Sequence, residues 1–248
     1  MAQKKINAIL FDLGDTLLNY GKIDPHEPFF KAASLTWHWL RQQGQPAGFQ
    51  WLYTFRSLTA IHFRMVLSHF TGRDFDSLQV LKKLGNRMKH QLTDEQYENL
   101  VWLWYQPLAE IVSIEPDLHK TLAALRAAGL KLAIVSNTFV SASVLNKHIR
   151  LLGLFEFFDF IYYSYMFKKR KPYPEMFLAA AKELNLPPQE IIFVGDRIDN
   201  DIVGSRDVGM VPVLKKNYAN IGKDVPQGVT LINSISELPA VIEKINNN

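Results

Sequence analysis

The 248-residue sequence predicts an α/β protein in which helices cover both faces of a parallel β-sheet. From about residue 114 onward, short apolar runs rich in β-branched side chains alternate with stretches of helical periodicity. Gly129 and Gly153 follow two of these helical stretches, where a glycine commonly ends a helix. Because parallel strands need a crossover connection, usually a helix, this alternation favours a parallel sheet over an antiparallel one.

The first expected strand, residues 6–11, is a short apolar run that ends at Asp12. Similar runs predict further strands at residues 132–135, 160–163, 191–194 and 211–214. The stretches between them predict helices at residues 118–128, 140–152, 175–184 and 202–208. The runs are apolar throughout rather than alternating, which indicates strands buried on both faces.

Residues 20–108 have a different pattern. They lack strand-like runs and are rich in aromatic side chains, several at three- and four-residue spacing, as in the series Phe30, Ser34, Trp37 and Arg41. This spacing predicts amphipathic helices, with the aromatic side chains packed between them. The sequence therefore predicts an all-helical module inserted between the first strand and the rest of the sheet.

Composition and charge exclude several classes of function. The chain has no cysteine, so it has no disulfide scaffold, thiolate zinc site or cysteine nucleophile. The apolar run at residues 8–11 is too short for a signal peptide or a membrane span, so we expect a cytoplasmic protein without a membrane partner. The net charge is +4, but the one compact basic run is residues 168–171, so we expect an anionic small substrate rather than nucleic acid.

Polar and acidic residues directly follow three of the expected strands. Asp12 to Thr16 follow the first strand, Ser136 and Asn137 the second, and Asp196 to Asp201 the strand at 191–194. Ligands of open parallel sheets bind beyond the carboxyl ends of the strands, so these segments are expected to converge on one crevice. Several buried carboxylates in one place favour a hard divalent cation such as Mg²⁺.

These segments resemble the four motifs of haloacid dehalogenase-like (HAD) hydrolases, in the family's order. The motifs are Asp12-x-x-x-Thr16, Ser136-Asn137, Lys171-Pro172 and Gly195-Asp196-x-x-x-x-Asp201. The resemblance implies a Rossmann-like core, residues 1–19 and 109–248, and a helical cap domain, residues 20–108, inserted after the first motif. It also implies a magnesium-dependent hydrolase that cleaves the phosphate ester of a small metabolite.

The resemblance implies a role for each matching residue. Asp12 is the implied nucleophile, which forms an aspartyl-phosphate intermediate. Ser136, Asn137 and Thr16 are the implied contacts of the phosphoryl group. Lys171 is the implied cation that neutralises charge shared by the nucleophile and the phosphoryl group.

The implied magnesium ligands are Asp12, the backbone carbonyl of Gly14, Asp196 and Asp201. Gly14 also marks a departure, because most phosphatases of the family have an acidic residue at this position that acts as general acid and base. Here the next acid is Asp15, so the proton comes from Asp15, from a water, or is not needed because the leaving group is good.

Three other functions stay open on the same residues. Haloacid dehalogenases use the same kind of nucleophile without magnesium, but they lack acids matching Asp196 and Asp201. Phosphonate-cleaving relatives also dispense with the acid at the Gly14 position. A catalytically silent binding protein with this fold is the third alternative.

Overall fold

The computed structural model describes residues 6–22 and 26–247, which form two compact units. The sheet unit holds the residues up to Gly21, Ser113–Asn137 and the residues from Leu152 onward. The helical unit holds Lys22–Val112 and Thr138–Leu151. The predicted boundaries place residues 138–151 with the sheet, whereas their contacts in the structure are with the inserted helices.

Within the described residues, six parallel strands form one sheet with the order β3-β2-β1-β4-β5-β6, which confirms the predicted α/β class. The strands are β1 (Ala8–Phe11), β2 (Lys131–Ser136), β3 (Phe160–Tyr163), β4 (Ile191–Gly195), β5 (Val211–Lys215) and β6 (Thr230–Ile232). β1 pairs with β2 on one side and with β4 on the other, so Phe11 lies beside both Ile134 and Val194. The three chain segments that follow these strands therefore leave the sheet at the same edge.

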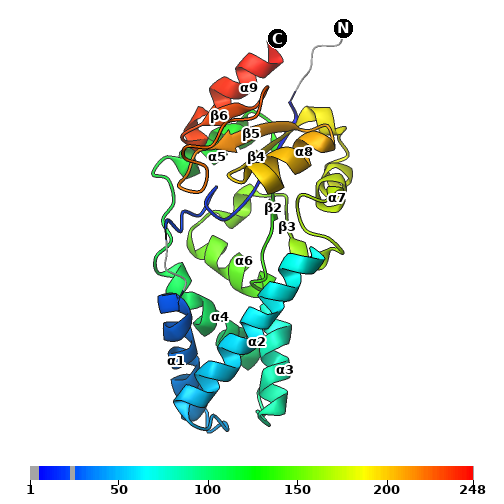
Figure 1. Cartoon of the computed structure of the whole chain (residues 1–248). Helices are drawn as coiled ribbons and strands as arrows, with labels where there is room; N and C mark the ends of the chain where they lie inside the picture. The colour runs from blue at the N-terminus through cyan, green and yellow to red at the C-terminus, as the bar shows by residue number, and fades with distance from the viewer. Residues whose placement is uncertain (1–5, 23–25, 248) are drawn as a thin grey trace. The chain divides into compact units, whose positions relative to one another are not determined.

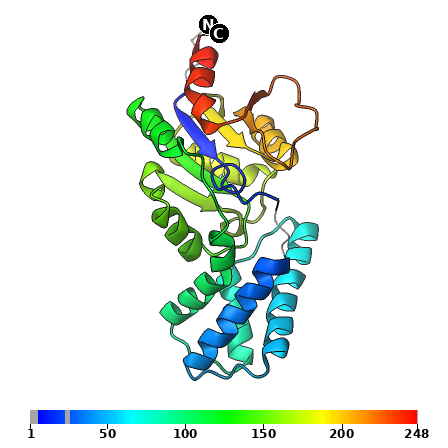
Figure 2. The same cartoon turned by 90° about the vertical axis from the view of Figure 1, so that its left-hand side faces the viewer.

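Helices cover both faces of this sheet (Figure 1, Figure 2). They are α5 (Leu118–Ala127), α7 (Pro174–Leu184), α8 (Val203–Asp207) and α9 (Leu238–Asn246). α7 and α8 lie on one face, and α5 and α9 on the other. Met176 and Phe177 of α7 pack with Leu10 of β1 and Phe193 of β4, all fully buried. Burial on both faces explains why the strands are apolar throughout.

Several short helical turns join these elements. They are η1 (Phe155–Phe157), η2 (Ser164–Met166), η3 (Pro188–Glu190), η4 (Ile198–Ile202) and η5 (Ile235–Glu237). η4 is a π-helical turn directly before α8, so the helix predicted at 202–208 begins with an irregular segment. π-turns of this kind often occur at functional sites.

The helical unit consists of α1 (His26–Gln42), α2 (Gln50–Thr71), α3 (Ser77–Arg87), α4 (Asp94–Ala109) and α6 (Ala142–Leu151). Side-chain caps start two of these helices: Asp76 accepts a hydrogen bond from the backbone of Leu78, and Thr93 forms a capping box with Gln96. The predicted inserted helices are therefore present. No helix of the described residues is both long and apolar enough to cross a bilayer.

The aromatic packing expected in this unit is only partly correct. Tyr53 is buried and donates a hydrogen bond to Thr36 at 3.0 Å. In contrast, Phe55, Phe63 and Phe70 on the same helix, α2, are 63%, 64% and 81% exposed. The inward face of α2 is lined by Tyr53 and small or β-branched residues instead, because α1 and α3 approach it closely.

A buried ion pair ties β5 to the segment before α5. Lys215 and Glu115 lie 3.0 Å apart with side chains only 5% and 15% exposed, and Glu115 also accepts hydrogen bonds from Ser234 and Ile235. Glu115→Ala leaves the ammonium buried without its partner, so we expect the free energy of unfolding to fall by about 3–5 kcal/mol. Urea unfolding measures this change.

The matched control is Arg126→Ala, which breaks a more exposed pair with Asp159 in the same unit. This change is expected to cost about 1 kcal/mol or less. Equal losses for the two variants would show that burial does not set the strength of the Lys215–Glu115 pair.

Acid is expected to destabilise the helical unit through His148. This ring is 4% exposed, and its Nδ1 lies 3.0 Å from the hydroxyl of Tyr105. Burial lowers its pKa below the usual 6.5, so the unfolded chain binds the proton at higher pH than the folded chain does. Stability is therefore lost as the pH falls below 6.5 through the lower folded pKa.

His148→Gln keeps a hydrogen-bonding side chain but cannot titrate. We expect a smaller loss of stability between pH 7 and pH 5 for this variant than for the native protein, measured by urea unfolding at both values. Replacement of the exposed His38 by Gln is the control. An unchanged pH dependence in His148→Gln would contradict the assignment.

Candidate active site

The carboxyl end of β1 places Asp12 at the edge of the sheet. Its backbone N–H donates to the carbonyl of Val194 at 2.8 Å, which continues the pairing of β1 with β4, and the residue is 7% exposed. The chain then turns, and the N–H groups of Leu17 and Leu18 both donate to the carbonyl of Leu13. This turn keeps the residues after Asp12 close to the strand ends.

The Lys171 side chain bridges two of the acidic segments. Its ammonium lies 2.7 Å from Oδ1 of Asp12 and 2.7 Å from Oδ1 of Asp201, and it also donates to the carbonyl of Val135 at 2.8 Å. Burial alone would lower the pKa of Lys171, but the carboxylates of Asp12 and Asp201 outweigh it and raise the pKa above the usual value. The ammonium is therefore charged.

The side chain of Asn137 holds the backbone of Lys171 in place. The side-chain oxygen of Asn137 accepts the N–H of Lys171, and its side-chain nitrogen donates to the carbonyl of Lys171, both at 2.9 Å. Both polar atoms of the Asn137 side chain thus contact Lys171, and the second N–H of this amide has no protein partner in these two bonds.

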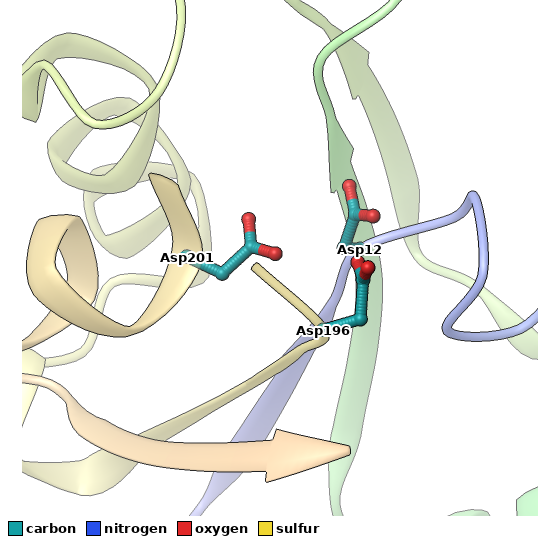
Figure 3. A group of neighbouring side chains, drawn as sticks. All are labelled: Asp12, Asp196 and Asp201. Atoms are coloured by element: carbon teal, nitrogen blue, oxygen red, sulfur yellow. The ribbon is translucent and has the colours of Figure 1, made fainter. Parts of the chain in front are cut away.

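Asp12, Asp196 and Asp201 form a buried cluster in which one carboxylate oxygen from each lies within 4.8 Å of the others (Figure 3). Burial, followed by the charges of Asp12 and Asp201, raises the pKa of Asp196 to about 7. Burial also raises the pKa of Asp201 to about 6, although Lys171 opposes this shift. Both shifts show that the cluster has more negative charge than its surroundings stabilise.

These residues fit a divalent cation. Carboxylate oxygens are the ligands that Mg²⁺ prefers, and one ammonium cannot balance three ionised carboxylates in a buried place. A bound cation would relieve the repulsion that raises the two pKa values. The donor set thus agrees with the cofactor that the sequence analysis expects.

The turn η4 and the glycine before Asp196 together place Asp201. The N–H of Asp201 donates to the carbonyl of Arg197 at 2.8 Å, and its carboxylate accepts the N–H of Arg197 at 3.0 Å. A Cβ atom on Gly195 would lie 2.5 Å from the side chain of Asp201. Glycine is therefore needed at position 195 for Asp201 to fold back over the end of β4.

The site opens into a cavity of about 210 Å³. All of the predicted site residues line it except Thr16, which is fully buried and lies with its hydroxyl 3.5 Å from Asp196. The lining residues are Asp12, Gly14, Asp15, Ser136, Asn137, Lys171, Asp196, Arg197, Asn200, Asp201, Tyr218 and Ala219. The structure thus brings the predicted residues together from the ends of β1, β2 and β4 and from the segment before α7.

Two residues at the site were not predicted from the sequence. Tyr218 lines the cavity and donates to Oδ2 of Asp15 at 2.9 Å, and Asn217 donates to Oδ2 of Asp196 at 2.8 Å. Both residues directly follow β5, so the argument from strand ends, applied to the expected strand at 211–214, would have found them. Arg197 and Asn200 lie within the fourth motif and also line the cavity.

Curated proteins similar to this chain include glyceraldehyde 3-phosphate phosphatases. The one from Methanocaldococcus jannaschii is 36% identical over 132 residues, which are 52% of this chain and 57% of that protein. The match thus spans little more than half the length of that relative. The one from Pyrococcus furiosus is 25% identical over 97% of this chain and 93% of its own length.

Solved structures with the same fold cover nearly the whole chain. A HAD phosphatase from Thermococcus onnurineus matches with a TM-score of 0.60 and 24% identity, over 96% of this chain and 98% of its own. A 2-haloacid dehalogenase from Pseudomonas syringae matches with a TM-score of 0.62 and 22% identity, over 96% and 99%. At this identity, the two structures show the fold alone. The family model of haloacid dehalogenase-like hydrolases matches residues 6–209, and this chain belongs to that family.

Proposed function

We propose that this chain is a magnesium-dependent phosphatase that cleaves the phosphate ester of a small metabolite through an aspartyl-phosphate on Asp12. The observation that carries the proposal is the Lys171 ammonium, held 2.7 Å from both Asp12 and Asp201 beside the third buried acid, Asp196. The names of the similar phosphatases from Methanocaldococcus jannaschii and Pyrococcus furiosus support a small phosphorylated substrate.

In the proposed reaction, a carboxylate oxygen of Asp12 attacks phosphorus and the ester P–O bond breaks. The leaving oxygen departs with the electron pair of that bond and takes up a proton. A water molecule then attacks the phosphorus of the aspartyl-phosphate, which releases phosphate and restores Asp12. Lys171 holds one oxygen of Asp12 in place through the contact at 2.7 Å.

Two further residues, Ser136 and Asn137, are proposed to hold the phosphoryl oxygens. Both line the cavity, and Ser136 offers its hydroxyl. Thr16 is buried next to Asp196 and does not line the cavity, so we propose that it assists indirectly, by supporting the turn after Asp12. Phosphoryl transfer depends mainly on such positioning and on neutralisation of charge.

We propose that Asp12, the carbonyl of Gly14, Asp196 and Asp201 hold the magnesium ion. Bound Mg²⁺ would supply positive charge next to the phosphoryl oxygens. The two acids Asp196 and Asp201 also favour phosphate chemistry over dehalogenation, which has no use for a cation site.

The two compact units support a division of roles between a core and a cap. We propose that the sheet unit is the catalytic core and that the helical unit is a cap that selects the substrate. A cytoplasmic location and the absence of a nucleic-acid partner stay predictions from the sequence.

The first test is hydrolysis of p-nitrophenyl phosphate with Mg²⁺ and with the metal removed by EDTA. We expect turnover that requires Mg²⁺ and falls at least about 10³-fold in Asp12→Asn, because the amide is a poor nucleophile. Asp207→Asn is the matched control, since Asp207 is exposed in the same unit and pairs only weakly with Arg206 at 3.9 Å. Turnover that survives in Asp12→Asn or with EDTA would refute the mechanism.

A second prediction concerns Gly195. In Gly195→Ala the new methyl group would meet the side chain of Asp201 at 2.5 Å, so Asp201 has to move. A displacement of about 1 Å in an active site can lower activity about 100-fold, and we expect a loss of this size in kcat/KM. Circular dichroism would show whether the variant is folded. A folded Gly195→Ala with native activity would show that the position of Asp201 is unimportant.

A further inference from the structure

The segment that follows β5 contacts two loops of the site, the loop after β1 and the loop after β4. This β5 loop, residues 216–220, lines the cavity with Tyr218 and Ala219. The side-chain nitrogen of Asn217 donates to Oδ2 of Asp196 at 2.8 Å and lies 3.4 Å from the carbonyl of Asp15. One amide group thus reaches the loop after β1 and the loop after β4.

The β5 loop is itself held by internal hydrogen bonds. The side-chain oxygen of Asn217 accepts the N–H of Ala219 at 2.8 Å. Asn220 is 6% exposed, and its side chain donates to the carbonyls of Asp196 and Lys215 at 2.9 and 2.8 Å while accepting the N–H of Asn217 at 3.1 Å. These bonds fix the loop relative to the ends of β4 and β5, so the side chain of Asn217 has a defined direction.

Asp15 is held from two sides. Its backbone is left-handed, with φ 56°, and its Oδ1 accepts the N–H of Tyr20 at 3.0 Å. Its Oδ2 accepts the hydroxyl of Tyr218 at 2.9 Å. Both oxygens of Asp15 are thus engaged by the protein, one by the backbone of Tyr20 and the other by the side chain of Tyr218.

We propose that the β5 loop is a positioning element of the site, in which Asn217 orients Asp196 and Tyr218 holds Asp15 as an anchor of the loop after β1 and not as a proton donor. This inference rests on the proposed function and selects among the proton sources left open by Gly14. This role excludes Asp15 as the proton source. Either a water supplies the proton, or the substrate has a good leaving group that needs none.

Two replacements of Asp15 distinguish a role as anchor from a role as proton donor. Asparagine and glycine both tolerate the left-handed backbone. In Asp15→Asn, the new amide can accept the N–H of Tyr20 and donate to the hydroxyl of Tyr218, because a hydroxyl can also accept. This amide cannot act as an acid. In Asp15→Gly, the anchor and the acid are removed together.

We expect Asp15→Asn to stay within about threefold of native kcat/KM, and Asp15→Gly to lose about tenfold, the worth of one or two hydrogen bonds to a charged group. The loss in Asp15→Gly should be equal for p-nitrophenyl phosphate and for an alkyl phosphate, whose leaving group needs a proton. Tyr218→Phe should also have a lower kcat/KM than the native protein. Tyr162→Phe, in the same unit, is the control. A loss in Asp15→Asn confined to the alkyl phosphate would overturn the proposal and assign Asp15 as the acid.

The role of Asn217 is tested without turnover. Mn²⁺ is a paramagnetic substitute for Mg²⁺, and its binding is measured by electron paramagnetic resonance. Asn217→Ala should weaken Mn²⁺ binding about tenfold, because Asp196 loses a hydrogen bond that orients it. Asn233→Ala, an exposed asparagine of the same unit, is the control. Native affinity in Asn217→Ala would overturn this part of the proposal.

Failure of the proposed function would look different from failure of this inference. If the native protein hydrolyses no phosphate ester, the phosphatase proposal fails, and the Mn²⁺ titration alone decides the role of Asn217. If native protein and Asn217→Ala bind Mn²⁺ equally or not at all, the positioning role fails, whatever the turnover.

Discussion

The buried ammonium of Lys171 is the interaction on which the arrangement of the site depends. With 1% of its side chain exposed, it is shielded from water and needs carboxyl partners, which Asp12 and Asp201 supply at 2.7 Å each. These partners come from the ends of β1 and β4, so one charge fixes the distance between two loops. Asn137 in turn fixes the backbone of Lys171 from the end of β2. Asp12, Lys171 and the other two acids of the cluster thus form one electrostatic unit.

The strand order determines which residues enter this unit. β1 lies between β2 and β4, so the residues after these three strands are neighbours at the carboxyl edge of the sheet. β5 comes next to β4, which brings Asn217 to Asp196. A site built on strand ends is rigid, because each functional residue continues directly from a buried, hydrogen-bonded strand. Gly195 and the π-turn at Ile198–Ile202 are the local adjustments that fold Asp201 back over this edge.

The sequence predicted the sheet and most of the cavity for a physical reason: buried parallel strands need apolar runs, and their ends need polar residues. The short edge strand Thr230–Ile232 was not predicted, although residues 229–232 form a short run rich in β-branched side chains, as in the predicted strands. Helical spacing predicted the inserted helices but not the outward face of α2, where Phe55, Phe63 and Phe70 are exposed. Periodicity locates an apolar stripe, whereas the neighbouring helices decide which stripe is buried. Asn217 belongs to no motif; its place after β5 fits the strand-end pattern, and its contact with Asp196 shows which group it holds.

Charge balance connects the acidic cluster to the substrate. Asp12, Asp196 and Asp201 carry up to three negative charges against the single charge of Lys171, and the raised pKa values of Asp196 and Asp201 show the resulting repulsion. A phosphate ester adds further negative charge at the same place, which a site of this composition alone would repel. A bound divalent cation would therefore have two functions here, since it would stabilise the cluster and make the cavity attractive to an anion. With such a cation, the acids that repel a phosphate ester would instead help the site to bind one.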